Sequence, residues 1–509
     1  MHPARSIGFI SMVLVSACIV GPSASVTSAA LPVRAGPTDS AMSRESRALL
    51  DSLVRARGVD RPGPSAVGAA SSADQPVSAG SIWSPMRLTL SEMRDVAWLD
   101  VLRDTQLVAL VSEAVSNNRD LRVARARIVE YRAQVVAARS GLFPQITANS
   151  SVSKNKVGFG TVIFQFYEAI ATVDLSWELD FWGRTRRATE AARFDLGIQE
   201  EDARFTTVSL VGDVATAYLQ LRELDESVRI TDETLVTRRA TLLLARQRYA
   251  QGVISELDVR QFEADLADPA ATLAALALQR AQAETRVSQL LGRPPGPIAR
   301  GRPLADVALA VTVPDSITAA LIAGRPDVMA SQRAWQAAIV RIASARAARL
   351  PDFAVTAEYG ALRAGVASIA GPTTETYLLQ LGVTVPVFDA GRLSSQERVA
   401  RARAEQARGQ YEQTVLTALH ESADALSGLR SGRDQLAARA TQVQALRSAY
   451  AMTVQRYQSG VSSYLEVLDA QRSLFSAQLS LVQVQGQYLI ATVDLYRALG
   501  GRWVEPSRH

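Results

Sequence analysis

The stretch QRYAQGVISELDV (247–259) returns almost letter for letter as QRYQSGVSSYLEV (455–467). The two copies are separated by 455 − 247 = 208 residues, and the same offset relates Gly252 to Gly460. An internal repeat is read before any other signal, because it identifies the unit from which the fold is built. We therefore predict a tandem duplication, in which each half of the chain contains the same elements in the same order.

Each quoted stretch ends a long helical pattern. The patterns run from about 184 to 250 and from about 392 to 458, roughly 67 residues each, or about 100 Å of helix at 1.5 Å per residue. A glycine after a last turn that contains Arg and Tyr is a usual helix stop. A second helix is predicted to return over 254–291 and over 462–499. The quoted stretch is thus the tip of a long helical hairpin, one per half.

A period of two replaces the helical period ahead of each long helix. The segments 145–153 and 171–179 alternate apolar and polar residues, and so do 353–359 and 377–385 in the second half. Such alternation is typical of membrane β-strands, although a half-buried strand of a soluble sandwich has the same pattern. Four strands are too few to close a barrel, whereas three copies of the chain would supply twelve.

Two short motifs join the strands to the long helices. DFWGR (180–184) and FDAGR (388–392) place Gly183 and Gly391 where the chain must turn sharply from strand to helix. We call these motifs the first and second elbow, each completed by the arginine after its glycine, Arg184 or Arg392.

One further helix is predicted before each pair of strands. These helices cover 107–140 and 317–350, and each ends just before a proline, Pro144 or Pro351, which favours an extended conformation in the residue before it. Pro269 lies inside the first returning helix, where a proline removes one backbone hydrogen bond and is expected to kink the helix.

The N-terminus has the pattern of a secretory signal. MHPARSIGFISMVLVSAC has a basic start, an apolar stretch and small residues before Cys18, the only cysteine. The sequence before Cys18 resembles a bacterial lipobox, in which the cysteine is acylated. The alternative is an ordinary cleavage site with an incidental cysteine. Residue Ile19 is not the aspartate associated with retention at the inner membrane, so an outer-membrane destination is expected.

The sequence divides into five predicted segments. These are a signal peptide (1–17), a lipidated N-terminus and flexible linker (18–95), a first structural repeat (96–300), a second structural repeat (301–503) and a C-terminal tail (504–509). The linker is rich in Ala, Ser, Gly and Pro and has too little apolar content to build a core.

Composition argues against several classes of protein. The formal net charge of +5 is small for 509 residues, and no basic patch with interleaved aromatics indicates nucleic-acid binding. Three histidines, His2, His420 and His509, and one cysteine do not predict a metal site. No phosphate-binding glycine loop and no GxSxG motif is present in the sequence. We expect neither an enzyme nor a cofactor.

The ordered set of motifs resembles the TolC-like outer-membrane efflux proteins, in particular their lipoprotein branch. The resemblance covers about 95–503, and the motifs that carry it are CIVGP (18–22), WLDVLRDTQL (98–107), SWELDFWGR (176–184), LLGRPPG (290–296), LPDF (350–353), VPVFDAGR (385–392) and the twin glycine tips. It implies a mostly α fold with membrane β: a homotrimer whose twelve-stranded β-barrel in the outer membrane continues into a long periplasmic α-helical barrel. It also implies a lipid-anchored exit duct that docks on a periplasmic adaptor (membrane fusion protein), which joins it to an inner-membrane pump of the RND or ABC type.

The resemblance also suggests roles for residues near the tips. Asp258, Glu466 and Asp469 are expected at the periplasmic aperture, where threefold symmetry would form rings of carboxylates that favour cations. The alternative is that these acids are solvated on an exposed helix face. The tip residues expected to contact the adaptor are Gly252, Val253, Leu257, Gly460, Val461 and Leu465, although they could simply form the turn.

The predicted function is a passive outer-membrane exit duct for drugs or other small molecules. The alternatives within transport are type I protein secretion and metal efflux. The alternative from another class is a periplasmic coiled-coil structural or adaptor protein, which would lack the four amphipathic strands.

Overall fold

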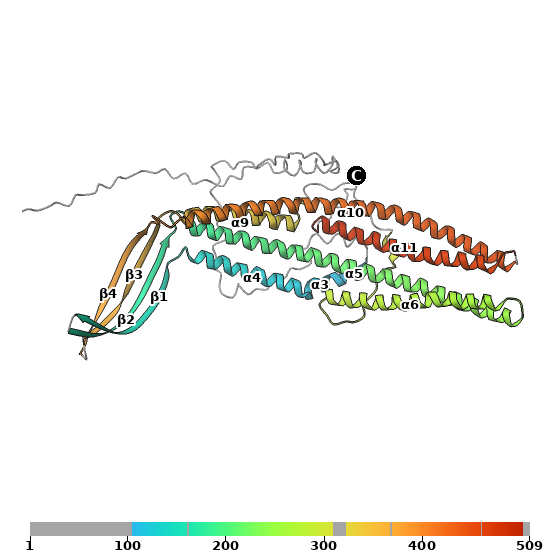
Figure 1. Ribbon diagram of the computed structural model, residues 1–509, viewed down its shortest axis with the longest axis horizontal. Helices are drawn as coiled ribbons and strands as arrows, with labels where there is room; N and C mark the ends of the chain where they lie inside the picture. Colours follow the sequence, from blue (N-terminus) through green and yellow to red (C-terminus); the bar gives the residue numbers. More distant parts are fainter. Residues whose placement is uncertain (1–103, 160–161, 309–321, 367–368, 460, 502–509) are drawn as a thin grey trace, which may run out of the picture. The chain divides into compact units, whose positions relative to one another are not determined.

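The computed structural model describes residues 104–159, 162–308, 322–366, 369–459 and 461–501 (Figure 1). Contacts divide the chain into two units, 1–60 and 61–509, and every described residue lies in the second. Cys18, the predicted linker and Gly460 lie outside the described residues.

The two halves share one order of elements, a helix, two strands and a long helical hairpin, which confirms the predicted duplication. The first half contains α3 (Thr105–Asn117), α4 (Arg119–Ser140), β1 (Gln145–Phe159), β2 (Val162–Leu179), α5 (Arg184–Ala250) and α6 (Glu256–Leu290), followed by the short α7 (Leu304–Ala308). The second half contains α9 (Pro326–Ala347), β3 (Asp352–Val366), β4 (Ile369–Thr384), α10 (Arg392–Gln458) and α11 (Tyr464–Ala498). The long helices α5 and α10 have 67 residues each, and the returning helices α6 and α11 have 35 each.

The prediction of a single helix over 107–140 is wrong, because the helix is interrupted at Asn118 and forms α3 and α4. The Asn118 side chain accepts hydrogen bonds from the backbone N–H groups of Asp120 and Leu121, at 2.8 and 3.2 Å, and so caps α4. The repeat places Arg325 at the same position, just before Pro326 at the start of α9. A proline is favoured in the first turn of a helix, so Pro326 was the sequence signal for this break.

The four strands form one antiparallel sheet in the order β1-β2-β3-β4 (Figure 1). They are longer than predicted, because pairing continues past the segments of strict alternation. The register aligns residues of the same kind across the strands: Ile146, Leu175, Ala357 and Leu379 form one row, and Gln145, Ser176, Thr356 and Gln380 form a neighbouring row on the opposite face. In the half of the sheet nearest the elbows, one face is therefore apolar and the other polar. Further along, the first face also carries charged side chains, such as Glu375, Arg363 and Lys154. Within the chain β1 and β4 are edge strands.

Helix α5 is the centre of the helical part. It contacts α3, α4, α6, α9 and α11, while α10 contacts α9 and α11. The largest buried cluster joins α3, α5 and α11 through side chains such as Val111, Val214 and Leu489. No helix in the described part of the chain combines the length and the apolar character needed to cross a membrane.

Tyr218 fastens two connecting segments to α5. Its hydroxyl donates to Asp104 Oδ2 at 2.9 Å and accepts from the Gly301 N–H at 2.8 Å. Asp104 also caps α3 by accepting from the N–H of Gln106 at 2.9 Å. Burial raises the pKa of the Tyr218 hydroxyl, so this phenol remains a donor. The segment between the two repeats is thereby held beside the start of α3.

Glu223 is a partly buried carboxyl group on α5. It lies against Gly486 of α11, where a Cβ would come within 2.2 Å of Glu223 Oε2. Burial raises the pKa of Glu223 to about 7 from 4.5. Between these two values the folded protein keeps a proton that the unfolded chain loses, so stability is lost as the pH rises through about 7.

We predict that Glu223→Gln raises the melting temperature of the detergent-solubilised protein at pH 8 and leaves it unchanged at pH 4. The glutamine removes a charge that is unfavourable in its site, an effect of about 1–2 kcal/mol once partial exposure is taken into account. Melting curves followed by circular dichroism across this pH range measure it. An equal difference in melting temperature at both pH values would contradict the assignment.

Candidate functional site at the hairpin tips and the elbows

The two hairpin tips are built in the same way. Gly252 has φ = +75°, and the N–H of Val253 donates to the carbonyl of Arg248 at 2.9 Å. In the second half the Val461 N–H donates to the carbonyl of Arg456 at 3.0 Å. This pattern ends a helix on a left-handed residue, a conformation that glycine adopts without strain. The left-handed conformation of Gly252 thus explains why the first tip turns at a glycine, as predicted.

Two of the three predicted aperture acids, Asp258 and Glu466, lie in the first turns of the returning helices. Asp258 Oδ2 accepts hydrogen bonds from the N–H and the hydroxyl of Ser255, at 2.9 and 2.7 Å, in a capping box. The hydrogen bond from the Ser255 hydroxyl is the main cause of the lowered pKa of Asp258, and the bond from the Ser255 N–H is the second cause. Glu466 has the matching place in α11, where its Oε1 accepts from the Ser463 N–H at 3.4 Å. This capping role was not predicted from the sequence.

Asp469 lies one turn further along α11 than Glu466, and both side chains are exposed. The two halves meet close to them. The Arg248 guanidinium donates to the Tyr457 hydroxyl at 2.6 Å, and the ring centroids of Phe262 and Tyr464 lie 3.9 Å apart. The two tips of one chain are therefore joined by side-chain contacts, which lie close to the acids of both returning helices.

Two aliphatic side chains project from each tip. Their exposed fractions are 65% for Val253 and 66% for Leu257 in the first half, and 68% for Val461 and 63% for Leu465 in the second. The tips thus present the same apolar pair twice, at positions related by the repeat. Exposed apolar groups in such an arrangement are typical of a surface that contacts a partner.

A buried ionic cluster, not foreseen from the sequence, joins α5 and α6 near the tips. In an α-helix the Asp265 carbonyl would accept from the N–H of residue 269, but Pro269 has none. The Arg238 guanidinium of α5 donates to this free carbonyl and also pairs with Asp265 Oδ1 at 3.0 Å. The side chains of Arg238 and Asp265 are each only 3% exposed. The helix α6 continues through Pro269, and the cluster replaces the hydrogen bond that the proline removes.

The same carboxylate connects α6 to α11. Arg472 Nε donates to Asp265 Oδ1 at 2.9 Å, so one aspartate holds arginines from two helices. The Arg238 guanidinium carbon lies 5.7 Å from the centre of the Phe475 ring of α11, within cation–π distance. Mid-helix Pro269 was the available sequence signal, since it predicts a free carbonyl four residues earlier.

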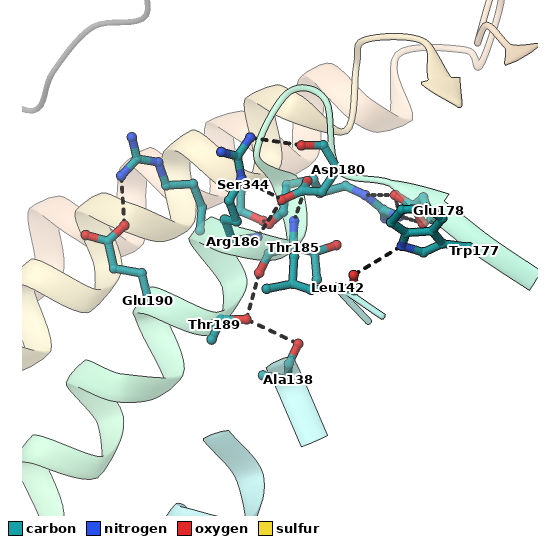
Figure 2. A network of polar contacts seen from close by, with 12 residues as sticks. Ala138, Leu142, Trp177, Glu178, Asp180, Thr185, Arg186, Thr189, Glu190 and Ser344 are labelled. Atoms are coloured by element: carbon teal, nitrogen blue, oxygen red, sulfur yellow. Dashed lines mark hydrogen bonds and ion pairs between the residues drawn. The ribbon is translucent and has the colours of Figure 1, made fainter. Parts of the chain in front are cut away.

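The first elbow is a network of polar contacts around Asp180 (Figure 2). Gly183 precedes α5 with φ = +80°. The Asp180 carboxylate accepts from the N–H groups of Thr185 and Arg186, at 3.0 and 2.8 Å, and so satisfies the start of α5. Arg184 forms a bidentate contact with Glu178 of β2, at 3.2 Å from its Nε. The strand and the helix are thus linked by charged groups on both sides of the glycine.

The second elbow uses a carboxylate one residue closer to its glycine. Asp389 accepts from the N–H of Gly391 at 2.9 Å and from that of Leu393 at 2.8 Å, and the latter bond is the main cause of its lowered pKa. Gly391 has φ = +84°, and Arg392 is the first residue of α10. Both predicted elbows are therefore sharp turns at a left-handed glycine.

The described residues contain no group of three or more His, Cys, Asp or Glu side chains placed to hold a metal ion. Charged side chains of these residues form ion pairs, some within one helix, such as Arg260 with Glu256, and some between helices, such as Arg238 with Asp265. The notable groups are the exposed tip pairs, the acids that begin α6 and α11, and the two elbows.

The chain is similar to known proteins along most of its length. The sequence pattern of the family described as "Outer membrane efflux protein" matches residues 110–293 and 318–501. The toluene efflux pump outer membrane protein TtgC of Pseudomonas putida is 33% identical over 439 residues, which cover 84% of this chain and 90% of TtgC. The cation efflux system protein CusC of Escherichia coli O157:H7 is 29% identical over 413 residues, covering 81% of this chain and 89% of CusC.

A solved structure shares the fold. The outer-membrane channel OprN superposes with a TM-score of 0.72 at 29% identity, over 80% of this chain and 92% of OprN. The residues that match the family pattern contain the sheet, the elbows and the long hairpins of both halves.

Proposed function

Because this chain belongs to the outer membrane efflux protein family, we propose that three copies of it form the exit duct of a tripartite efflux pump. The predicted TolC-like fold and outer-membrane efflux function are those of the family. The relatives are outer-membrane efflux proteins, and they do not support the alternative of a coiled-coil structural or adaptor protein. Members of the family are channel proteins, and we assign the chain no catalytic role.

The sheet is the observation that carries this proposal. The apolar face of its half nearest the elbows suits lipid, and its two edge strands are unpaired within one chain. Backbone groups at an open edge are costly inside a membrane, so the edges must pair with further strands. Three copies joined β4 to β1 give twelve strands and leave no edge. The long helices then extend from the elbows into the periplasm.

The tips are the proposed contact with the partner proteins. The exposed pairs Val253 with Leu257 and Val461 with Leu465 offer apolar area to the helical hairpins of a periplasmic adaptor. A glycine in each repeat, Gly252 or Gly460, adds no side chain that would prevent close approach. The adaptor in turn connects the duct to an inner-membrane pump of the RND or ABC type. The repeat provides two such contacts per chain.

The proposed cargo is a class of small organic molecules. TtgC is named for a toluene efflux pump and is more similar to this chain than CusC, which is named for cation efflux. Metal efflux and type I protein secretion are the other candidates within transport. A wide duct binds no cargo tightly, so selectivity is assigned mainly to the inner-membrane pump.

We predict that Glu466→Ala combined with Asp469→Ala weakens block by multivalent cations in planar bilayers. Threefold symmetry places three copies of each carboxylate around the aperture, and Asp258 adds a further ring. The measurement is single-channel conductance with increasing hexamminecobalt on the periplasmic side, with Glu256→Ala as a matched exposed control on α6. Block that is unchanged in the double variant would contradict the role of these acids. Failure to form any channel would contradict the proposed function itself.

Cys18 is proposed to carry lipid, and the segments 1–17 and 18–95 to be the cleaved signal and the lipidated linker. Cys18→Ser is predicted to abolish incorporation of radiolabelled palmitate in growing cells. Labelling that persists in the variant would show that another site is acylated, or that the modification is unrelated to the lipobox.

A further inference from the structure

Arginines are paired differently at the two elbows. At the first elbow Arg184 contacts Glu178, Arg186 contacts Asp180 and Arg187 contacts Glu190, so each guanidinium has its own carboxylate. At the second elbow three arginines share one carboxylate. The repeat thus provides two copies of one turn that differ in their balance of charge.

The shared carboxylate is Glu397 of α10, whose side chain is 5% exposed. It accepts from Arg349 Nη1 at 2.7 Å, Arg401 Nη2 at 2.6 Å and Arg346 Nε at 3.4 Å. We call these three residues the arginine cluster. Three positive charges and one negative charge leave the cluster and Glu397 with a net charge of +2. The contacts to Glu397 use one nitrogen of each guanidinium, and each guanidinium has five N–H donors.

The arginine cluster is half exposed. The exposed fractions of the side chains are 52% for Arg346, 50% for Arg349 and 58% for Arg401. Glu397 therefore acts as a buried anchor that holds three guanidinium groups together while leaving each partly in solvent. An isolated group of like charges would separate by repulsion, so this anchor is needed to keep them adjacent.

The cluster lies where the apolar surface of the sheet ends. Arg349 is three residues before the start of β3 at Asp352. The exposed apolar surface continues past β4 to Phe388, which is 89% exposed and immediately precedes Asp389 of the second elbow. Phe143 and Phe181 are exposed at the corresponding level of the first half. Exposed aromatic side chains at the end of an apolar band mark the level of the lipid headgroups.

We propose that the arginine cluster binds the phosphate groups of anionic phospholipids in the periplasmic leaflet of the outer membrane. The inference relies on the placement of the sheet in the membrane, which is part of the proposed function. Guanidinium groups bind phosphate oxygens with paired, charge-assisted hydrogen bonds, and three of them held on one anchor form a preorganised site. Basic residues beside a membrane surface attract anionic lipid in this way.

The test compares two matched variants of the full chain. The cluster variant carries Arg346→Gln, Arg349→Gln and Arg401→Gln together with Glu397→Gln, so that no unpaired carboxylate is left buried. The control variant removes the same number of charges at and just after the first elbow, by Arg186→Gln, Arg187→Gln and Glu190→Gln together with Arg193→Gln, an exposed arginine of α5. Native mass spectrometry then counts phosphatidylglycerol retained by each purified protein, with phosphatidylcholine as the neutral probe.

We expect the cluster variant to retain about one tenth or less of the phosphatidylglycerol that the unmodified chain retains. The control variant should retain as much as the unmodified chain. A third variant with lysine at all three arginine positions keeps the charge and should retain an intermediate amount. Phosphatidylcholine should bind the unmodified chain and both glutamine variants equally. Equal phosphatidylglycerol retention by the cluster and control variants would overturn the proposal. So would a cluster variant that dissociates into single chains but binds lipid normally, because the cluster would then contact a neighbouring copy.

Discussion

Replacing Val253 and Leu257 together by aspartate is expected to abolish pump-dependent resistance while leaving the protein in the outer membrane. Both side chains are about two-thirds exposed in the single chain, so the substitutions cost little folding stability. A docked adaptor would bury them, and two carboxylates buried in an apolar contact lose their hydration without gaining a partner. The expected loss is complete: the minimal inhibitory concentration of an exported compound should fall to that of a strain lacking the gene.

The same substitution at Val461 and Leu465 tests the duplication. Because the second tip presents the same apolar pair, its aspartate variant should also lose resistance. The matched control replaces Val253 by Ile and Leu257 by Met, which keeps the apolar character and should keep resistance. Full resistance in an aspartate variant that is present at normal levels in the outer-membrane fraction would refute the docking role of that tip.

Arg238→Met is expected to cause the largest loss of stability of any single substitution near the tips. It leaves the buried Asp265 carboxylate with only Arg472, and it leaves the carbonyl freed by Pro269 without its donor. Breaking a buried ion pair from one side costs about 3–5 kcal/mol. The measurement is the unfolding transition of the solubilised protein, with Arg239→Met, an exposed neighbour on α5, as the control.

A double-mutant cycle with Pro269→Ala isolates the backbone part of this loss. Alanine restores an N–H that can bind the Asp265 carbonyl, so Arg238→Met should cost about 1–3 kcal/mol less in the Pro269→Ala background than in the original chain. If the unfolding free-energy costs of the two substitutions are additive, Arg238 stabilises only the Asp265 carboxylate and not its carbonyl. The account of Pro269 would then be wrong.

The extents of the long helices were predictable because strong local signals mark both ends. The glycine of each elbow opens a helix, and the glycine stretch at each tip closes one, so 184–250 and 392–458 match α5 and α10. The far ends of the strands were not predictable, since Lys154, Asn155 and Lys156 interrupt the alternation and only pairing with β2 extends β1. The break at Asn118 was missed because the helical pattern continues across it.

Contacts between distant residues account for the rest of what the sequence did not reveal. Arg238 and Asp265 lie 27 residues apart on different helices, and Arg472 lies a further 207 residues along the chain. No local pattern links the three; only the mid-helix proline pointed to one of them. The aperture role of Asp258 was suggested by the family resemblance, whereas its capping box with Ser255 depends on where α6 begins.

The most direct test of the account is an electron cryomicroscopy reconstruction of the full-length protein in lipid nanodiscs. The account predicts three chains around a continuous axial passage, with β4 of each chain hydrogen-bonded to β1 of the next inside the lipid disc and the helical hairpins beyond it. Particles whose sheets stay open at the edges, or whose centre is filled along its length, would contradict it.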